Sequence, residues 1–225
     1  MSAPIRIIAM VVVTALFVWV FFSLAGRWDW MRGWTYIGIL IAGNAINELV
    51  LWFRNPELFR LRGRTGEGTK TWDKVCLALF GLTVMLILIV GALDAGRYQW
   101  SVMPFWLWPF GVALYAGGQA LLIWSMVVNP FFEKTARIQK DRDHRVVDGG
   151  PYALVRHPGY VGIILGFVLG SPLMLGSWWA FVPAAISALS LVVRTALEDR
   201  MLRAGLEGYK AYATRVRYRL IPYFW

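Results

Sequence analysis

Six long apolar segments constrain the fold of this 225-residue chain more than any other feature of its sequence. A helix of about 20 apolar residues crosses a bilayer, and in lipid it satisfies its backbone hydrogen bonds internally. Apolar residues make up 58% of the chain, which is too much for a soluble domain of this size. The sequence therefore predicts an all-α integral membrane protein with about five to six transmembrane helices. The segments cover residues 5–24, 34–53, 74–93, 104–128, 160–175 and 178–193.

The first segment and the last two need separate interpretation. Residues 5–24 form a long apolar run without a convincing small-residue cleavage site, so we expect a retained helix and not a cleaved signal peptide. Segments 160–175 and 178–193 are shorter and meet at Gly176, which favours a tight helical hairpin. Their length leaves open whether both cross the bilayer fully.

Positive charge lies almost entirely on one side of these segments. Of the 23 Lys and Arg residues, 20 fall on the side that carries both termini and the two long polar loops, whereas Arg27, Arg32 and Arg97 fall on the other. Cytoplasmic loops are enriched in Lys and Arg, so we expect both termini and any site built from these loops to be cytoplasmic. The net charge of +10 indicates contact with anionic lipids and does not identify a substrate.

Residues 148–162 read D-G-G-P-Y-A-L-V-R-H-P-G-Y-V-G and are the strongest candidate for a chemical site. Pro158 disfavours helical geometry at His157, so the His-Pro step predicts a bend or the first turn of a new helix. Gly149 and Gly150 allow a ligand to approach the backbone closely. Because residues 160–175, which follow, are apolar enough for a transmembrane segment, we expect this loop to enter the membrane surface, where it can surround a ligand.

Polar residues inside the apolar segments have both structural and functional explanations. Asn44, Asn47 and Glu48 share one helical face. Amide side chains at such positions commonly join helices, whereas an ionisable group at that depth suggests a functional site. The sequence does not decide between these roles. Close contact between helices is also the simplest explanation for Gly117, Gly118 and Gln119.

The remaining polar segments are expected at the surface. We expect loop 54–73 to be solvated near lipid headgroups, with a substrate lid as the alternative, and residues 131–147 to form a solvated interfacial helix. The basic and aromatic tail, residues 208–225, suits a membrane interface better than nucleic acid. Arg194 and Glu198 are spaced i, i+4 on one helix, so they form either a weak surface ion pair or part of a site.

The chain offers little for metal catalysis. Its single cysteine, Cys76, lies inside an apolar segment. Its two histidines, His144 and His157, are separated by glycines and a proline, which is poor spacing for a metal site. We therefore expect no metal cofactor.

Several short motifs lie between residues 137 and 222. They are R-I-Q at Arg137 to Gln139, H-R-V-V at His144 to Val147, G-P-Y at Gly150 to Tyr152, R-H-P-G-Y-V-G at Arg156 to Gly162, R-x-x-x-E-D at Arg194 to Asp199, and the terminal G-Y-x-x-Y and R-L-I-P. Together they resemble the isoprenylcysteine carboxyl methyltransferase family, which belongs with the membrane phospholipid methyltransferases. The R-H-P-x-Y-x-G motif with a downstream Glu is specific for this superfamily and not for a substrate.

The resemblance implies a methyltransferase with S-adenosylmethionine as cofactor, held between the cytoplasmic loops and the C-terminal helix. It divides the chain into N-terminal spans, residues 1–128, and a methyltransferase module, residues 129–225. It implies catalytic roles for Arg194, which would face the acceptor, and for Glu198. The cofactor-binding residues that it implies are Gln139, His144, Arg145, Val146, Val147, Tyr152, His157, Tyr160 and Glu198.

The acceptor implied by the resemblance is lipophilic and reaches the site through the bilayer. It is either an isoprenylcysteine-like carboxylate or another small lipophilic carboxylate, thiol or phospholipid amine. Methyl transfer needs alignment more than acid–base power, which agrees with a site of carboxylate, imidazole and tyrosine side chains. Two alternatives remain open at this stage: a sterol-reductase-like enzyme that uses NADPH, and a non-catalytic lipid-binding membrane protein.

Overall fold

A computed structural model describes residues 3–61 and 68–225 of the chain, and within these ranges the regular structure is entirely helical. Five helical stretches are long and apolar enough to cross a membrane, and Val11–Ala25, within the first helix, is a shorter apolar stretch. The protein is therefore an all-α, multi-pass membrane protein, as the sequence predicts. The α-helices are α1 Ala3–Ala25, α2 Met31–Arg54, α3 Pro56–Leu61, α4 Thr71–Gly91, α5 Trp108–Val128, α6 Pro158–Ile163, α7 Gly170–Leu175, α8 Phe181–Gly205 and α9 Tyr209–Arg215.

Short helical turns of other types extend or connect these helices. The π-helical turn η1, Ala92–Tyr98, continues α4, and η5, Ile164–Leu169, joins α6 to α7 in one span. The 3₁₀ turn η2, Phe105–Leu107, leads into α5. The 3₁₀ turns η3, Lys140–Arg142, and η4, Gly150–Ala153, lie in the long connection between α5 and α6.

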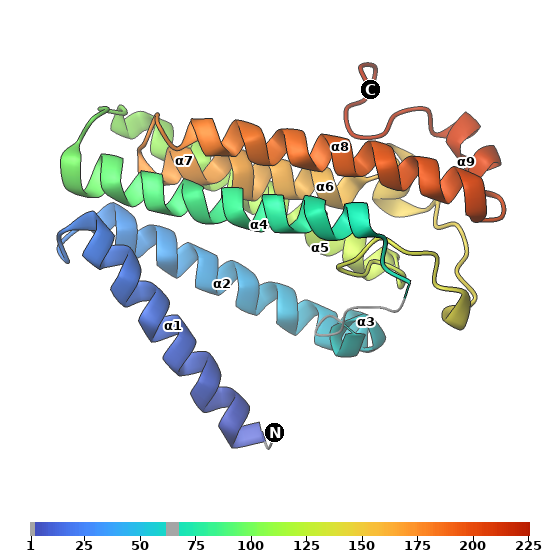
Figure 1. Cartoon of the computed structure of the whole chain (residues 1–225), viewed down its shortest axis with the longest axis horizontal. Helices are drawn as coiled ribbons and strands as arrows, with labels where there is room; N and C mark the ends of the chain where they lie inside the picture. The colour runs from blue at the N-terminus through green and yellow to red at the C-terminus, as the bar shows by residue number, and fades with distance from the viewer. Residues whose placement is uncertain (1–2, 62–67) are drawn as a thin grey trace.

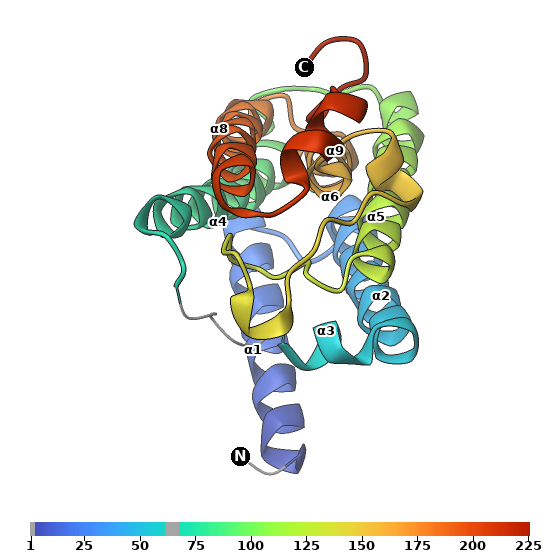
Figure 2. The same ribbon diagram turned by 90° about the vertical axis from the view of Figure 1, so that its right-hand side faces the viewer.

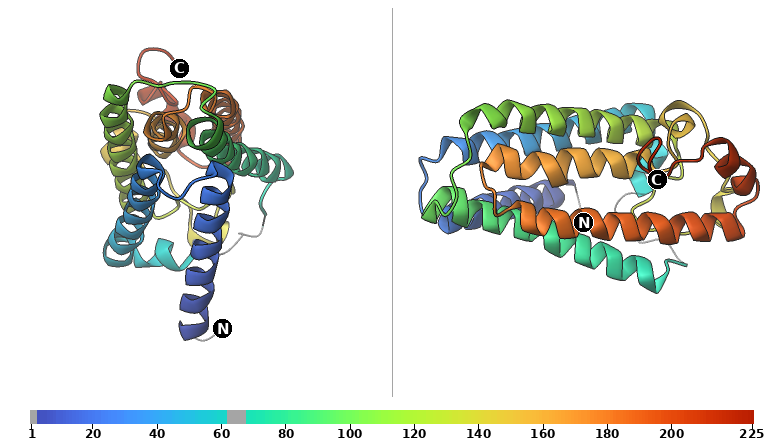
Figure 3. Two further views of the ribbon diagram at one scale, coloured as in Figure 1. Left: turned by 90° about the vertical axis from the view of Figure 1, so that its left-hand side faces the viewer. Right: turned by 90° about the horizontal axis from the view of Figure 1, so that it is seen from above.

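The long helices form an elongated bundle (Figure 1). Helix α4 packs against α8, and α5 packs along the span formed by α6, η5 and α7. Helix α2 packs on α5 and α7, whereas α1 contacts η1 and leans away from the bundle toward its N-terminus (Figures 1 and 3). The apolar faces that point away from the bundle remain exposed, as expected for surfaces in contact with lipid.

The last two apolar segments form the hairpin that the sequence predicts. Residues Pro158–Leu175 and Phe181–Gly205 both have the length and hydropathy of membrane spans. Gly176, at φ +81°, ends α7 and donates its N–H to the carbonyl of Pro172 at 2.9 Å. Glycine adopts this left-handed conformation at low cost, which permits the tight turn.

Backbone contact between glycines brings α5 and the α6–α7 span close together. A Cβ atom added at Gly118 would lie 2.5 Å from the carbonyl oxygen of Gly162 and 2.4 Å from the nitrogen of Gly166. Gln119 is buried and donates to the hydroxyl of Tyr115 at 3.1 Å. The predicted helix contact is therefore confirmed at Gly118, whereas the Gln119–Tyr115 bond lies within α5 and Gly117 has no atom within 4 Å of an added Cβ.

Helices α3 and α9 and the connection between α5 and α6 lie at the same end of the bundle (Figures 1 and 2). The prediction of an interfacial helix over residues 131–147 is wrong, because this segment is irregular apart from η3. Side chains take the place of helical hydrogen bonds here. Gln139 donates to the carbonyl of Phe131, and Arg142 donates to the carbonyl of Pro130. These contacts hold the segment as a folded loop.

Candidate active site

A large cavity lies beneath this loop and continues between the helices. Its volume is about 1190 Å³, whereas pockets for one small molecule commonly measure about 300–1,000 Å³. One part of the lining is polar and comes from the loop before α6, the start of α6, and α8. The other part comes from apolar residues of α4, α5, α6 and α8: Leu77, Ala78, Phe80, Leu122, Met126, Ile163 and Leu191.

All the site residues implied by the resemblance line this one cavity. They approach it from segments that are distant in sequence, because the α5–α6 connection and α8 meet at the same end of the bundle. The structure thus brings together every member of the implied set. The residues are Gln139, His144, Arg145, Val146, Val147, Tyr152, His157, Tyr160, Arg194 and Glu198.

His157 caps the N-terminus of α6, and Pro158 is the first helical residue. The predicted His-Pro helix start is therefore confirmed. The imidazole is nearly parallel to the Tyr160 ring, with centroids 5.7 Å apart and an interplanar angle of 4°. Its Nε2 atom is buried without a hydrogen-bond partner and lies 3.9 Å from Oδ1 of Asp199, which is too far for a hydrogen bond.

Tyr160 links the two residues of α8 that the sequence places on one face. Its hydroxyl donates to the Glu198 carboxylate, and its ring lies 5.2 Å from the guanidinium carbon of Arg194. The ring and the guanidinium are within the range of a cation–π contact. The arrangement orients the carboxylate and the guanidinium through one aromatic side chain.

Arg194 does not form the surface ion pair with Glu198 that was one sequence-based expectation. It is buried, and its Nε atom donates to Oδ1 of Asp73 at 2.7 Å. The sequence interpretation places Asp73 in a solvated loop, but the residue lies in the first turn of α4 and has no exposed surface. Packing of α4 against α8 brings these oppositely charged residues together.

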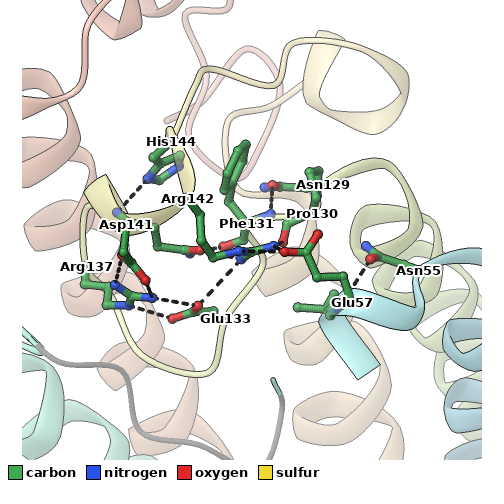
Figure 4. Close-up of polar contacts among 12 residues, drawn as sticks. Asn55, Glu57, Asn129, Pro130, Phe131, Glu133, Arg137, Asp141, Arg142 and His144 are labelled. Atoms are coloured by element: carbon green, nitrogen blue, oxygen red, sulfur yellow. Dashed lines mark hydrogen bonds and ion pairs between the residues drawn. The ribbon is translucent and has the colours of Figure 1, made fainter. Parts of the chain in front are cut away.

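A network of charged side chains holds the loop over the cavity (Figure 4). The guanidinium of Arg137 donates to Glu133 at 2.8 and 3.0 Å and to Asp141 at 2.6 and 3.2 Å. Arg142 donates to Glu57 of α3 at 3.0 Å (Figure 4) and to the side-chain oxygen of Gln139 at 2.6 Å. Both polar groups of Gln139 are therefore used within the loop, which supports the cavity wall.

The surroundings of His144 disfavour the charged form of its imidazole. Burial lowers the pKa of its imidazole, and the ring lies 4.5 Å from the ring of Phe131. The Nδ1 atom accepts a hydrogen bond from the backbone N–H of Gln139 at 3.3 Å. Glu198 lies close enough to oppose this pKa shift electrostatically, so His144 and the carboxylate belong to one site.

Tyr152 and residues 145–147 form another wall of the cavity. The Tyr152 hydroxyl accepts from the amide of Asn129, while its carbonyl accepts from the hydroxyl of Tyr212. Val146 packs against an apolar cluster formed by the end of α8 and α9. The wall is thus anchored to the C-terminal part of the chain.

Asp199 does not line the cavity but supports residues that do, a role that the sequence interpretation missed. Although only 1% exposed, it accepts hydrogen bonds from Arg156 at 2.7 Å, Tyr209 at 3.1 Å and Arg219 at 3.0 Å. Arg156 also donates to the carbonyls of the tail, and the backbone N–H of His157 donates to the carbonyl of Arg219 at 3.0 Å. Asp199 and the tail therefore fix the backbone on which His157 is mounted.

Thr135 was also missed. Its hydroxyl is buried beside the cavity without a hydrogen-bond partner in the described structure. A buried polar atom without a partner costs free energy unless water or a ligand satisfies it. A single Thr in a charged loop carries no sequence signal for a role in ligand binding. For Asp199 there was a signal, because it directly follows Glu198 in the R-x-x-x-E-D motif.

The polar residues of α2 differ in their surroundings. Asn44 donates to the carbonyl of Leu40 in its own helix, and Asn47 is buried with Oδ1 unpartnered in the described structure. Glu48 lines the cavity. The structure does not give these three residues one common role.

The fold and the cavity define an integral membrane protein whose polar candidate site is continuous with an apolar space between its spans. Residues 111–204 match the sequence model of the isoprenylcysteine carboxyl methyltransferase family. This region, which is less than half of the chain, is similar to the methyltransferases of that family.

The chain was also compared with solved structures and with curated proteins. A solved structure of the eukaryotic intramembrane Ras methyltransferase ICMT, an isoprenylcysteine carboxyl methyltransferase, is similar over 99% of this chain and 87% of that chain. The two share 16% sequence identity, and the TM-score is 0.48. No curated protein matches the chain.

Proposed function

We propose that the protein transfers a methyl group from S-adenosylmethionine to a lipophilic acceptor inside this cavity. The observation that carries the proposal is the lining, which joins the polar residues His157 and Glu198 to the apolar residues Leu122 and Leu191 in one space. A nucleoside cofactor needs the first kind of surface, and a lipid needs the second. The cavity volume leaves room for both.

The polar residues fit the chemistry of this cofactor. The buried Nε2 of His157 and the Thr135 hydroxyl lack partners within the described structure and would hydrogen-bond to a polar ligand. The Glu198 carboxylate would accept hydrogen bonds from ribose hydroxyls, since it has more acceptor sites than the Tyr160 hydroxyl uses. The ring of Tyr152 or Tyr160 would pack against the base.

When bound, S-adenosylmethionine supplies an electrophilic methyl group on a sulfonium ion. The protein's task is to hold the acceptor in line with that group and to exclude water. Residues of the loop line the polar part of the cavity, and residues of the helices line the apolar part. This arrangement does not require the protein to provide a strong acid or base.

We also propose that the acceptor is an isoprenylcysteine-like carboxylate, although a lipophilic thiol or a phospholipid amine remains compatible with the apolar lining. Arg194 supports the carboxylate, because its guanidinium lines the cavity and pairs well with a carboxylate. The N-terminal spans, residues 1–128, contribute Leu77 and Leu122 to the acceptor side. The module of residues 129–225 contributes most of the polar side.

We propose further that the cavity end and both termini face the cytoplasm, because the basic residues gather there. Cys76 is the chain's single cysteine. Replacing Cys76 with Ser and introducing one cysteine at Lys210 or at Arg97 therefore gives two variants, each with a single cysteine at a known position. An impermeant maleimide applied outside intact cells should label the Arg97 position and not the Lys210 position. The reverse pattern contradicts the orientation.

Ligand-dependent thermal unfolding in detergent tests the cofactor. S-adenosylmethionine and S-adenosylhomocysteine should both raise the unfolding temperature, because a ligand that binds only the folded state stabilises it. NADPH at the same concentration serves as the control. Stabilisation by NADPH alone would support a reductase, and stabilisation by none of the ligands would contradict methyl transfer at this cavity.

A methyl-labelled cofactor then identifies the acceptor. Purified protein is incubated with N-acetyl-S-farnesylcysteine, dodecanethiol or phosphatidylethanolamine, and extracted lipid is counted. The proposal expects label on the prenylated carboxylate, with Glu198→Ala protein as the blank. Label on the thiol or the amine alone would change the acceptor class and retain the enzyme class.

A further inference from the structure

Asp73 is a buried anion in contact with both the loop and α8. It lies in the first turn of α4, and it has no exposed surface. Its Oδ1 atom accepts from Nε of Arg194 at 2.7 Å, and its Oδ2 atom accepts from the backbone N–H of Ala136 at 2.8 Å. Asp73 also lies outside residues 111–204, the part that matches the family.

Only one edge of the Arg194 guanidinium is held by the protein. Its Nε atom bonds to Asp73, and its Nη2 atom donates to the carbonyl of Lys134 at 2.9 Å. These hydrogen bonds to described residues use Nε and Nη2 and not Nη1, and the side chain lines the cavity. The guanidinium has a second pair of donors, formed by Nη1 and the remaining Nη2 hydrogen, which suits a carboxylate.

We propose that Asp73 is a positioning residue that compensates the charge of Arg194 and turns its Nη1 edge toward the acceptor carboxylate. This inference rests on the proposed function and adds a determinant of acceptor alignment. A guanidinium with both edges unoccupied can hold a carboxylate in several orientations. With the Nε edge taken by Asp73, one orientation remains.

The proposal predicts opposite effects for the two members of the pair. Asp73→Asn removes a negative charge beside the acceptor site, so an anionic acceptor should bind more tightly but with poorer alignment. Arg194→Met removes the positive charge, so the same acceptor should bind less tightly. A purely structural role for Asp73 would instead weaken the binding of charged and uncharged acceptors together.

The experiment compares two matched probes in protein saturated with S-adenosylhomocysteine. They are N-acetyl-S-farnesylcysteine and its methyl ester, which has the same prenyl chain but no carboxylate. Dissociation constants are measured by titration calorimetry in detergent. In Asp73→Asn the acid should bind at least about threefold more tightly, whereas in Arg194→Met it should bind about tenfold more weakly. The ester should change by less than about twofold in both variants.

Turnover of the acid provides the second readout. In Asp73→Asn, kcat with S-adenosylmethionine should fall by about tenfold although the acid binds more tightly, because alignment is lost. Acid affinity that stays the same or falls in Asp73→Asn overturns the proposal. So does an unchanged kcat.

If Asp73→Asn alone does not fold, the double variant Asp73→Asn with Arg194→Met takes its place. The double variant removes both charges of the pair and therefore leaves no unpaired charge buried. It should match Arg194→Met in its affinity for acid, ester and S-adenosylhomocysteine. Weaker binding of the ester or of S-adenosylhomocysteine overturns the proposal. If wild-type protein binds S-adenosylhomocysteine but does not bind the acid more tightly than the ester, the proposal is overturned and the proposed methyl transfer is not. If wild-type protein does not bind S-adenosylhomocysteine, the proposed function itself is contradicted.

Discussion

Asp199 accepts a hydrogen bond from Nε of Arg156 at 2.7 Å, and each side chain is 1% exposed. The pair joins α8 to the residue that precedes His157. Since the Nη1 atom of Arg156 also donates to the carbonyls of Val216 and Arg217, removal of the carboxylate disturbs both the site and the tail.

The first prediction concerns this pair. Asp199→Ala should lower the free energy of unfolding by about 3–5 kcal/mol, because it leaves a buried guanidinium without its counter-ion. SDS-titration unfolding in mixed micelles measures this change. Arg203→Ala is the matched control, because its side chain is 43% exposed and contacts the same carboxylate. The control should lose less than about 1 kcal/mol, and equal losses for both variants would contradict the assigned importance of Arg156.

The second prediction concerns the contact between α5 and α6. Gly118→Ala should destabilise the protein by about 1–3 kcal/mol, because the added Cβ overlaps the backbone at Gly162 and Gly166. The adjacent Gly117→Ala is the control, since its Cβ would meet no atom within 4 Å. It should be neutral or slightly stabilising. Thermal unfolding of both variants in one detergent makes the comparison, and similar unfolding temperatures would argue against the close packing.

The third prediction concerns pH. Burial lowers the folded-state pKa of His144 below its ordinary value, so the unfolded chain takes up the proton first as the pH falls. The stability contributed by the neutral imidazole is therefore complete above about pH 6.5 and is lost as the pH drops through the lower folded-state value. Protonation also removes the acceptor for the Gln139 N–H.

This contribution is isolated by comparing the unfolding free energies of wild type and His144→Asn between about pH 7.5 and about pH 4.5. This range extends to both sides of the ordinary histidine pKa of about 6.5. The asparagine oxygen can accept the Gln139 N–H but does not titrate. The difference between the two proteins should shrink or reverse as the medium becomes acidic. A difference that is independent of pH would show that His144 does not titrate in this way. Other charged groups that act on His144 are common to both proteins: Glu198, Arg137, Arg142 and Glu133.

These predictions rest on features that the sequence reveals unequally. The spans, the hairpin at Gly176 and the helix start at Pro158 follow from local patterns, because chain length, hydrophobicity and proline geometry act within a few residues. The implied site residues also lie together, since their motifs flank the same end of the bundle. Their roles toward a cofactor stay predictions.

Asp73 and the loop before α6 were beyond a sequence-based interpretation. Asp73 and Arg194 are 121 residues apart, and their pairing depends on the rotation and depth at which α4 packs against α8. Residues 131–147 have the charge pattern of a surface helix. Instead, the side chains of Gln139 and Arg142 donate to the carbonyls of Phe131 and Pro130, and no sequence periodicity reveals these contacts.

The most direct test of the account is the affinity of S-adenosylhomocysteine for purified wild type and Glu198→Ala, measured by titration calorimetry. Glu207→Ala is the matched control, because this glutamate is exposed beyond the end of α8. We expect one site per chain, a loss of affinity of about tenfold or more in Glu198→Ala, and a change of less than about twofold in Glu207→Ala. Absence of binding by wild type, or equal affinities in all three proteins, would contradict a cofactor site at Glu198.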